Sequence, residues 1–203
     1  MKKFIKGAFY DYYPDIPHWD APVDREFNGK KISGRPTKAY GSTNFEYAGK
    51  VYKPEPWSYS IEPIKWAAET LVFEELGRAI DFNFCLCGMY KNGRIAIPHH
   101  SDTVPRQKDL VVSISFGSPR VFEWREYGNR IKAKSNTSKI NNLSTTQGFG
   151  RAVVSEIKET TQYLMENGDV FIFDGASQMT ATHAVPPLKG TGERINLTFR
   201  TGL

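Results

Sequence analysis

The chain has almost no cysteine and no long apolar run, and both absences narrow what it can be. Of its 203 residues only two, Cys85 and Cys87, are cysteines. They are too few for a disulfide framework and lack the C-x-x-C spacing of a zinc motif. A reducing compartment, cytoplasm or nucleus, is therefore expected. No apolar run approaches the roughly 20 residues of a membrane-spanning helix, and no apolar signal core follows the basic start, so we expect neither a membrane partner nor a secretory signal.

The chain is mildly basic, and its basic residues are unevenly distributed. Lysine and arginine outnumber aspartate and glutamate by 27 to 22, which gives a formal net charge of +5. Residues 128–151 hold five basic side chains and no acidic one, and residues 25–38 are also rich in lysine and arginine. Two basic segments beside a catalytic core suit a phosphate backbone, and a solvated basic surface is the alternative. We expect nucleic acid as the partner and a monomeric protein.

The hydrophobic pattern changes twice along the chain. Residues 1–60 are rich in glycine, proline, tyrosine and lysine, which predicts mostly irregular structure with short strands. Pro63 suits the first turn of a helix, and apolar residues recur at helical spacing from there to Ile80. After Asp81 the pattern becomes that of strands. The strands are predicted over 82–90, 94–97, 110–116, 120–124, 152–157, 161–165, 170–173, 182–185 and 194–200.

This order of elements predicts one compact domain of the α+β class, mainly β. Eight or nine short strands after one long helix are typical of a two-sheet sandwich or jelly roll buttressed by a helix. Residues 166–169 are expected to form a turn, and the polar residues 126–150 to form an insertion between strands. We expect the thiols of Cys85 and Cys87 to point to opposite faces of the first strand of this series.

Three residues suggest a metal site. His100 and Asp102 form an H-x-D pair, and on an extended segment residues i and i+2 share a face, so both can reach one ion. His183 lies in a second strand-like segment. Two histidines and one carboxylate leave three coordination positions open, as in non-haem Fe(II) oxygenases. H-x-D occurs often by chance. A buried structural histidine is therefore the alternative for each of the two histidines.

The last predicted strand, Arg194–Arg200, adds an independent pattern. Polar and apolar residues alternate in it, so Arg194, Asn196, Thr198 and Arg200 share one face. Two guanidiniums on one face of an interior strand are costly when unpaired, and a dicarboxylate ligand would pair with both. A solvent-facing basic edge strand is the alternative. H-x-D, a distant histidine and R-x-N-x-T-x-R together are far more specific than any one of them.

In this combination the sequence resembles the AlkB family of Fe(II)- and 2-oxoglutarate-dependent dioxygenases, over roughly residues 24–203. The branch that repairs alkylated double-stranded DNA is the most similar. The residues that support the resemblance follow the family's order: 82–93, 100–102, 113–117, Arg120, Phe122, 168–170, His183 and Arg194–Arg200. The resemblance implies a double-stranded β-helix (jelly-roll) core over 61–203 with a buttressing helix. Residues 1–60 would be an N-terminal extension and nucleotide-recognition lid.

The resemblance also implies roles for individual residues. His100, Asp102 and His183 would be the catalytic iron ligands. Arg194 and Arg200 would bind the two ends of 2-oxoglutarate. Tyr90 and Asn196 would hydrogen bond to this cosubstrate, and O2 would be the other reactant.

In the lid, the resemblance implies five substrate-binding residues. Arg35 and Tyr40 belong to its motif ending in Ala-Tyr-Gly, and Phe45 follows it. Tyr47 falls where an aromatic ring stacks on a flipped base. Phe27 falls where the duplex-repair branch inserts a finger residue, and a phenylalanine packed under a loop is the alternative for it.

Two positions differ from the family pattern. The family usually has asparagine two residues before the tyrosine, to bind the cosubstrate, and this chain has Gly88. The family's nucleic-acid enzymes also carry an acidic residue just after H-x-D, which contacts a cationic methylated base. Here Asp102 is followed by Thr-Val-Pro, which affects the charge of the base that the site would accept.

The leading functional hypothesis is oxidative demethylation of alkylated bases in DNA or RNA, releasing formaldehyde and succinate. The base must leave the stack to reach the iron, which explains aromatic residues beside a basic rim. One alternative is an AlkB-like hydroxylase acting on a neutral base, a free nucleotide or a protein side chain. A second is a non-catalytic nucleic-acid-binding protein that keeps the fold.

Overall fold

The computed structural model gives the fold of most of the chain. It describes residues 1–27, 30–32, 34–47, 50–101, 110–128, 132–133, 152–153, 157–175, 177 and 180–202. Asp102 lies outside these ranges, as does nearly all of the polar insertion. In the described ranges no helix is long and apolar enough to cross a membrane.

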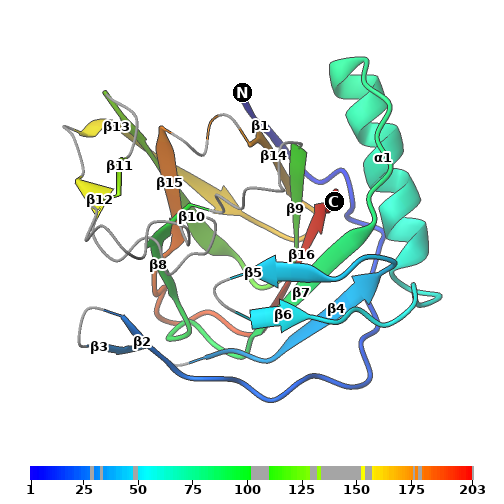
Figure 1. Cartoon of the computed structure of the whole chain (residues 1–203), viewed down its shortest axis with the longest axis horizontal. Coiled ribbons are helices and arrows are strands. Elements are labelled where there is room, and N and C mark those ends of the chain that lie inside the picture. Colours follow the sequence, from blue (N-terminus) through cyan, green and yellow to red (C-terminus); the bar gives the residue numbers. More distant parts are fainter. Residues whose placement is uncertain are drawn as a thin grey trace.

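A six-stranded antiparallel sheet, here the major sheet, occupies the centre of the molecule (Figure 1). Its central strand, β16, pairs with β9 on one side and β7 on the other. In spatial order its strands are β1 (Lys2–Ile5), β14 (Val170–Asp174), β9 (Leu110–Gly117), β16 (Arg194–Arg200), β7 (Phe84–Tyr90) and β4 (Thr37–Gly41).

A four-stranded minor sheet faces the major one, and the described residues also form three two-stranded sheets (Figure 1). The minor sheet has the order β13 (Ile157–Met165), β10 (Arg120–Tyr127), β15 (Ala181–Val185) and β8 (Ile97–His100). The two-stranded sheets are β2 (Arg25–Phe27) with β3 (Lys30–Ile32), β5 (Phe45–Tyr47) with β6 (Lys50–Tyr52), and β11 (Lys132–Ala133) with β12 (Ala152–Val153).

The single described helix, α1 (Glu62–Leu76), covers the face of the major sheet that points away from the minor sheet. Ile64, Ala68 and Val72 are buried against this sheet face, as the helical spacing of the apolar residues requires. The apolar pattern extends to Ile80, but the helix ends four residues earlier. Gly77 takes the left-handed conformation, with φ 64°, and its N–H donates to the Phe73 carbonyl at 2.8 Å, a usual helix ending.

Alternation along the strands gives the major sheet buried apolar residues on both faces. On the helix side, Ile195, Leu197 and Phe199 of β16 pack beneath α1. On the other side, Tyr90 and Phe171 pack against minor-sheet residues that include Trp124. The space between the two sheets is therefore lined by the opposite face of β16, the one with the polar residues.

Most sequence predictions for the fold are confirmed, with corrections to one strand and to the two cysteines. The mainly β sandwich, the helix and the 166–169 turn are present. The strand predicted at 94–97 is displaced to Ile97–His100. Cys85 and Cys87 do not point to opposite faces: their sulfur atoms are 3.9 Å apart, because residues two apart in a strand share a face.

Residues 1–60 contain short strands within a mostly irregular segment, as predicted. They supply β1 at one edge of the major sheet and β4 at the other. The division at residue 60 therefore does not coincide with a break in the sheet. A separate role for residues 1–60 stays a prediction.

The helix-side core gives a direct test of the fold. Phe199 is fully buried, with its ring centroid 5.8 Å from that of Phe82 and 6.4 Å from that of Trp57. We expect Phe199→Ala to lower the free energy of unfolding by about 3–5 kcal/mol, because it removes apolar contacts and leaves a cavity. Phe73→Ala, at a 60% exposed position of α1, should change it by less than about 0.5 kcal/mol. Urea titration measures both; equal losses would contradict the packing.

Candidate metal and cosubstrate site

Two histidines predicted as metal ligands are brought together across the minor sheet. His100 of β8 and His183 of β15 are direct partners in the strand register. Their ring centroids are 4.3 Å apart. Facing pairs of this kind have their Cβ atoms about 4.5–5.5 Å apart. The two imidazoles are therefore placed to share one ion.

The backbone of β8 sets the tautomer of His100. Its Nδ1 lies 2.9 Å from the carbonyl oxygen of Pro98. A carbonyl can only accept, so Nδ1–H is the donor and the lone pair of the neutral ring is on Nε2. A metal-ligating histidine is usually held in this way, with one ring nitrogen bonded to a backbone carbonyl and the other facing the metal.

His183 is held by an aromatic cage. Its ring is nearly parallel to the Trp124 indole, at 9° and 6.1 Å between centroids. Phe122 and Phe173 lie at 5.4 and 5.3 Å, and only 6% of His183 is exposed. Rigid neighbours on several sides fix the ring plane before any ligand arrives.

Asp102, the third predicted ligand, lies outside the described residues. Within the described ranges no group of three or more histidine, cysteine, aspartate or glutamate side chains is arranged to hold a metal. The structure thus brings together two of the three predicted ligands, His100 and His183. The assignment of all three to iron stays a prediction.

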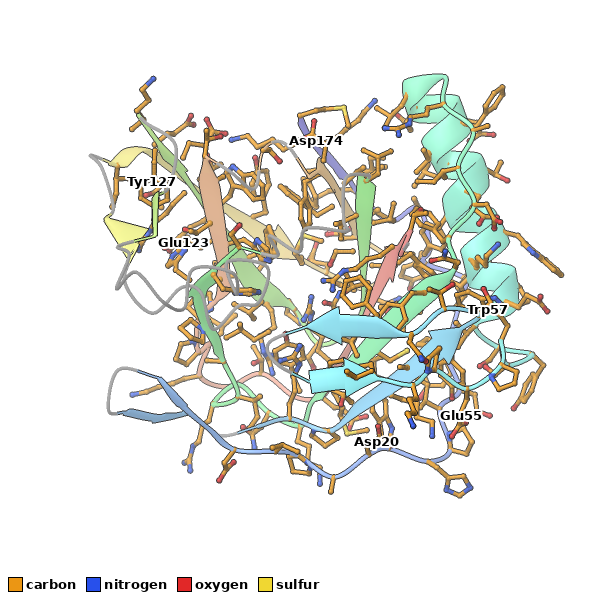
Figure 2. All side chains as sticks on the ribbon, viewed as in Figure 1. Asp20, Glu55, Trp57, Glu123, Tyr127 and Asp174 are labelled. Atoms are coloured by element: carbon orange, nitrogen blue, oxygen red, sulfur yellow. The ribbon has the colours of Figure 1, made fainter. Side chains whose placement is uncertain are left out.

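A polar network that sequence reasoning missed anchors β8 on its outer face. His99 bonds through Nε2 to Glu123 at 2.6 Å and through Nδ1 to the Thr182 hydroxyl at 3.1 Å. Figure 2 shows Glu123 and Tyr127 on β10, and the Tyr127 hydroxyl also bonds Thr182 at 3.0 Å. Burial lowers the pKa of His99. Because neighbours in a strand alternate, anchoring His99 outward directs His100 inward.

The two arginines of β16 are buried at the centre of the major sheet. Arg194 is 2% exposed and Arg200 is 3% exposed. Their strand pairs on both sides, so the alternative of a solvent-facing edge strand is wrong. Both arginines lie on the face between the sheets, opposite the apolar side chains of Ile195, Leu197 and Phe199.

The surroundings of Arg194 suit an anion. Its Nη2 donates to the Ser115 hydroxyl at 2.8 Å, whereas its buried Nε and Nη1 have no hydrogen-bond partner in the part of the chain described. Burial lowers the pKa of Arg194, Tyr90 opposes this shift, and Arg120 and Arg35 lower the pKa further. Clustered guanidinium groups with unused donors are stabilised by a carboxylate. The residues therefore fit a dicarboxylate such as 2-oxoglutarate.

Tyr90 and Asn196, predicted to hydrogen bond to the cosubstrate, lie on the same face. Tyr90 is the register partner of Arg194, and the Arg194 Cζ atom is 4.9 Å from the centre of its ring. Asn196 donates to the Ile114 carbonyl at 2.7 Å and to the Ser113 hydroxyl at 3.0 Å. These bonds orient the amide of Asn196 beside the arginines.

The five predicted substrate residues are not brought to one surface. Tyr40 is buried in the helix-side core, with Cys85 and Cys87 among its cluster, and burial raises its pKa to about 12. This position favours a packing role for Tyr40 over a substrate contact, because the major sheet lies between Tyr40 and Arg194. Phe45 is also buried: it stacks on Phe84 with centroids 4.7 Å apart, and the Arg200 guanidinium lies 5.3 Å from its ring centre. Phe45 thus supports Arg200.

Of the other three predicted substrate residues, the structure describes the side chain of Arg35 alone. Phe27 and Tyr47 lie in β2 and β5, but their side chains are outside the described structure. Their predicted substrate contacts stay predictions. Arg35 lies against Gly88 and Tyr90, so it belongs to the same face of the major sheet as Arg194.

An ion pair that sequence reasoning also missed joins segments within residues 1–60. Lys38 of β4 is largely buried and pairs with Glu55 and, at 4.0 Å, with Asp20. Figure 2 shows Asp20 and Glu55 at the β4 edge of the major sheet. Three segments of residues 1–60 are therefore held together at this edge of the major sheet.

Comparison with known proteins agrees with this geometry. A family model described as the 2OG-Fe(II) oxygenase superfamily matches residues 8–200. The chain is 29% identical over 171 residues to alpha-ketoglutarate-dependent dioxygenase alkB homolog 3 of Rattus norvegicus and of Homo sapiens. It is 25% identical over 172 residues to DNA oxidative demethylase ALKBH2 of Bos taurus. These alignments cover 82% of this chain and 50%, 51% and 52% of the respective relatives, so the chain spans about half the length of the curated relatives it matches.

A solved structure extends the comparison to the fold. The structure of OsALKBH1 superposes with a TM-score of 0.61 at 17% identity, over 98% of this chain and 97% of that chain. This likeness shows a shared fold, the jelly roll described above. We conclude that the chain belongs to the 2OG-Fe(II) oxygenase superfamily and, within it, to the AlkB family, a membership that implies Fe(II) and 2-oxoglutarate as cofactors.

Proposed function

We propose that this chain is an AlkB-type dioxygenase that oxidatively demethylates alkylated bases in DNA or RNA. One observation is the main support: His100 pairs in register with His183, opposite a strand in which the buried Arg194 has donors with no partner among the described residues. A metal-binding pair facing an anion-binding strand is what an oxygenase with a dicarboxylate cosubstrate requires.

In this proposal the residues of the chain bind and orient the reactants. His100, Asp102 and His183 would hold Fe(II), and Arg194 and Arg200 would hold the carboxylates of 2-oxoglutarate. When bound, Fe(II) and 2-oxoglutarate would supply an oxidation by O2 that yields succinate and CO2. The methyl group of the base would be hydroxylated and would then leave as formaldehyde. The aromatic cage of His183 would exclude water from the reacting centre.

Nucleic acid as the substrate is supported by charge and by the relatives. Arg25, Lys30, Lys31 and the basic residues of 128–151 would contact phosphates, and one relative is described as a DNA oxidative demethylase. The sequence Thr-Val-Pro after Asp102 lacks an acid to pair with a cationic base. This feature favours the second candidate, a hydroxylase acting on a neutral base, a free nucleotide or a protein side chain.

The first test concerns the metal ligands. We expect His183→Ala to lower formaldehyde release from methylated oligonucleotides at least about 100-fold, since even the loss of a group that only supports a ligand costs about 10–100-fold. His18→Ala, at an exposed position, is the matched control and should keep wild-type release. Equal release from wild type and His183→Ala would refute the ligand assignment.

The second test concerns Arg194. Methionine has a similar volume and no charge, so Arg194→Met should leave the thermal midpoint of the protein without cosubstrate unchanged or higher. Addition of 2-oxoglutarate with Mn(II), at about 100 times its Kd, should raise the wild-type midpoint by about 5–10 °C and leave that of the variant unchanged. Differential scanning calorimetry measures both; an equal shift in the variant would exclude Arg194 from cosubstrate binding.

The third test identifies the substrate. A panel of oligonucleotides carries 1-methyladenine, 3-methylcytosine or N6-methyladenine, each in DNA and in RNA. We expect formaldehyde release that requires both Fe(II) and 2-oxoglutarate from at least one member. Release from N6-methyladenine alone would select a neutral base. Succinate formation without formaldehyde from any member would favour a free nucleotide or a protein side chain.

A further inference from the structure

Arg35 occupies the space left by the family's missing asparagine. A Cβ atom built on Gly88 would lie 2.6 Å from the Arg35 Nε and 3.4 Å from its Cζ. No real side chain fits at that distance, so Gly88 and the position of Arg35 depend on each other. The departure from the family pattern at Gly88 therefore comes with a guanidinium that fills the same space.

The backbone places Arg35 there firmly. It precedes β4 by two residues, and β4 pairs with β7 so that Thr37 faces Gly88. The Pro36 carbonyl accepts a hydrogen bond from the Met89 N–H at 3.0 Å. The segment is thus tied to β7 on both sides of Gly88, and the reach of the Arg35 side chain over the sheet follows from this pairing.

Arg35 and Arg194 share one aromatic neighbour. The Arg35 Cζ is 5.2 Å from the centre of the Tyr90 ring, and the Arg194 Cζ is 4.9 Å from it. Both distances are in the range of cation–π contacts. The ring therefore orients two guanidiniums at the same end of β16.

The two positive charges of Arg35 and Arg194 repel each other. Burial lowers the pKa of Arg194, and Arg120 and Arg35 lower it further. The buried Nε of Arg35 has no hydrogen-bond partner within the described ranges, and the same holds for Nε and Nη1 of Arg194. Such a pair is costly alone and is stabilised when one carboxylate lies near both.

We propose that Arg35 is a cosubstrate-binding residue, which with Arg194 binds a carboxylate of 2-oxoglutarate. This inference rests on the proposed function and deepens it. It also reassigns Arg35, which the resemblance places among the nucleotide contacts. A guanidinium donates to a carboxylate with a charge that an amide lacks, so the arginine more than replaces the asparagine.

The test measures binding instead of turnover. Isothermal titration of 2-oxoglutarate into the Mn(II)-loaded protein under argon gives its Kd. We expect Arg35→Ala to raise this Kd at least tenfold, since the variant loses charge-assisted hydrogen bonds to the carboxylate. Arg94→Ala, at an exposed position in the turn after β7, is the matched control and should stay within twofold of wild type.

A double variant adds a readout that a purely structural role would not move. Gly88→Asn alone should weaken binding, because its side chain meets Arg35. Gly88→Asn combined with Arg35→Ala removes that clash and installs the family's amide, so its Kd should be lower than that of either single variant. Additive losses in the double variant would contradict the proposal.

Two outcomes separate this proposal from the proposed function. If wild type and Arg35→Ala bind 2-oxoglutarate equally, Arg35 is not a cosubstrate residue. A weaker affinity of that variant for a methylated oligonucleotide would then return Arg35 to the nucleotide contacts. If wild type binds no 2-oxoglutarate at all, the cofactor assignment falls, and this proposal with it.

Discussion

The interior position of charged arginines on β16 is the constraint on which the rest of the site depends. Arg194 and Arg200 lie at the two ends of a strand that is paired on both sides. The free energy to bury them comes from the apolar face of the same strand, where Ile195, Leu197 and Phe199 pack under α1. One strand thus borders both the hydrophobic core and a polar interior, because its successive side chains point to opposite faces.

The two sheets contribute different chemistry to the space between them. The minor sheet supplies imidazoles, fixed by the Pro98 carbonyl on β8 and by the Trp124 indole beside β15. The major sheet supplies guanidiniums, hydroxyls and the Tyr90 phenol. The Pro98 carbonyl and the Ser115 hydroxyl each lie in the same sheet as the side chain they hold, and Phe173 of the major sheet adds a contact to His183 of the minor sheet. This arrangement is preorganisation on rigid elements.

Local patterns predicted the faces of the strands well, and contacts between distant segments poorly. The alternation in Arg194–Arg200 correctly separated the arginines from the core residues. The apolar spacing placed α1, whereas its end needed the conformation of Gly77. The His99–Glu123 bond and the Lys38 ion pairs join segments remote in sequence, and no local signal reports them. Tyr40 and Arg35 belong to one motif, yet their side chains lie on opposite faces of the sheet. They are five positions apart, and an odd separation along an extended segment places two side chains on opposite faces.

The pairing of β8 with β15 has a consequence for the stability of the minor sheet. β8 is its edge strand, and its register with β15 is irregular between His183 and Val185. Edge strands with interrupted ladders open more easily than central ones. An ion bound by both His100 and His183 would join the two strands through their side chains, as a cross-link does. Hydrogen exchange of the β8 amides would then slow with metal occupancy, and the edge of the sheet would become a reporter of the metal.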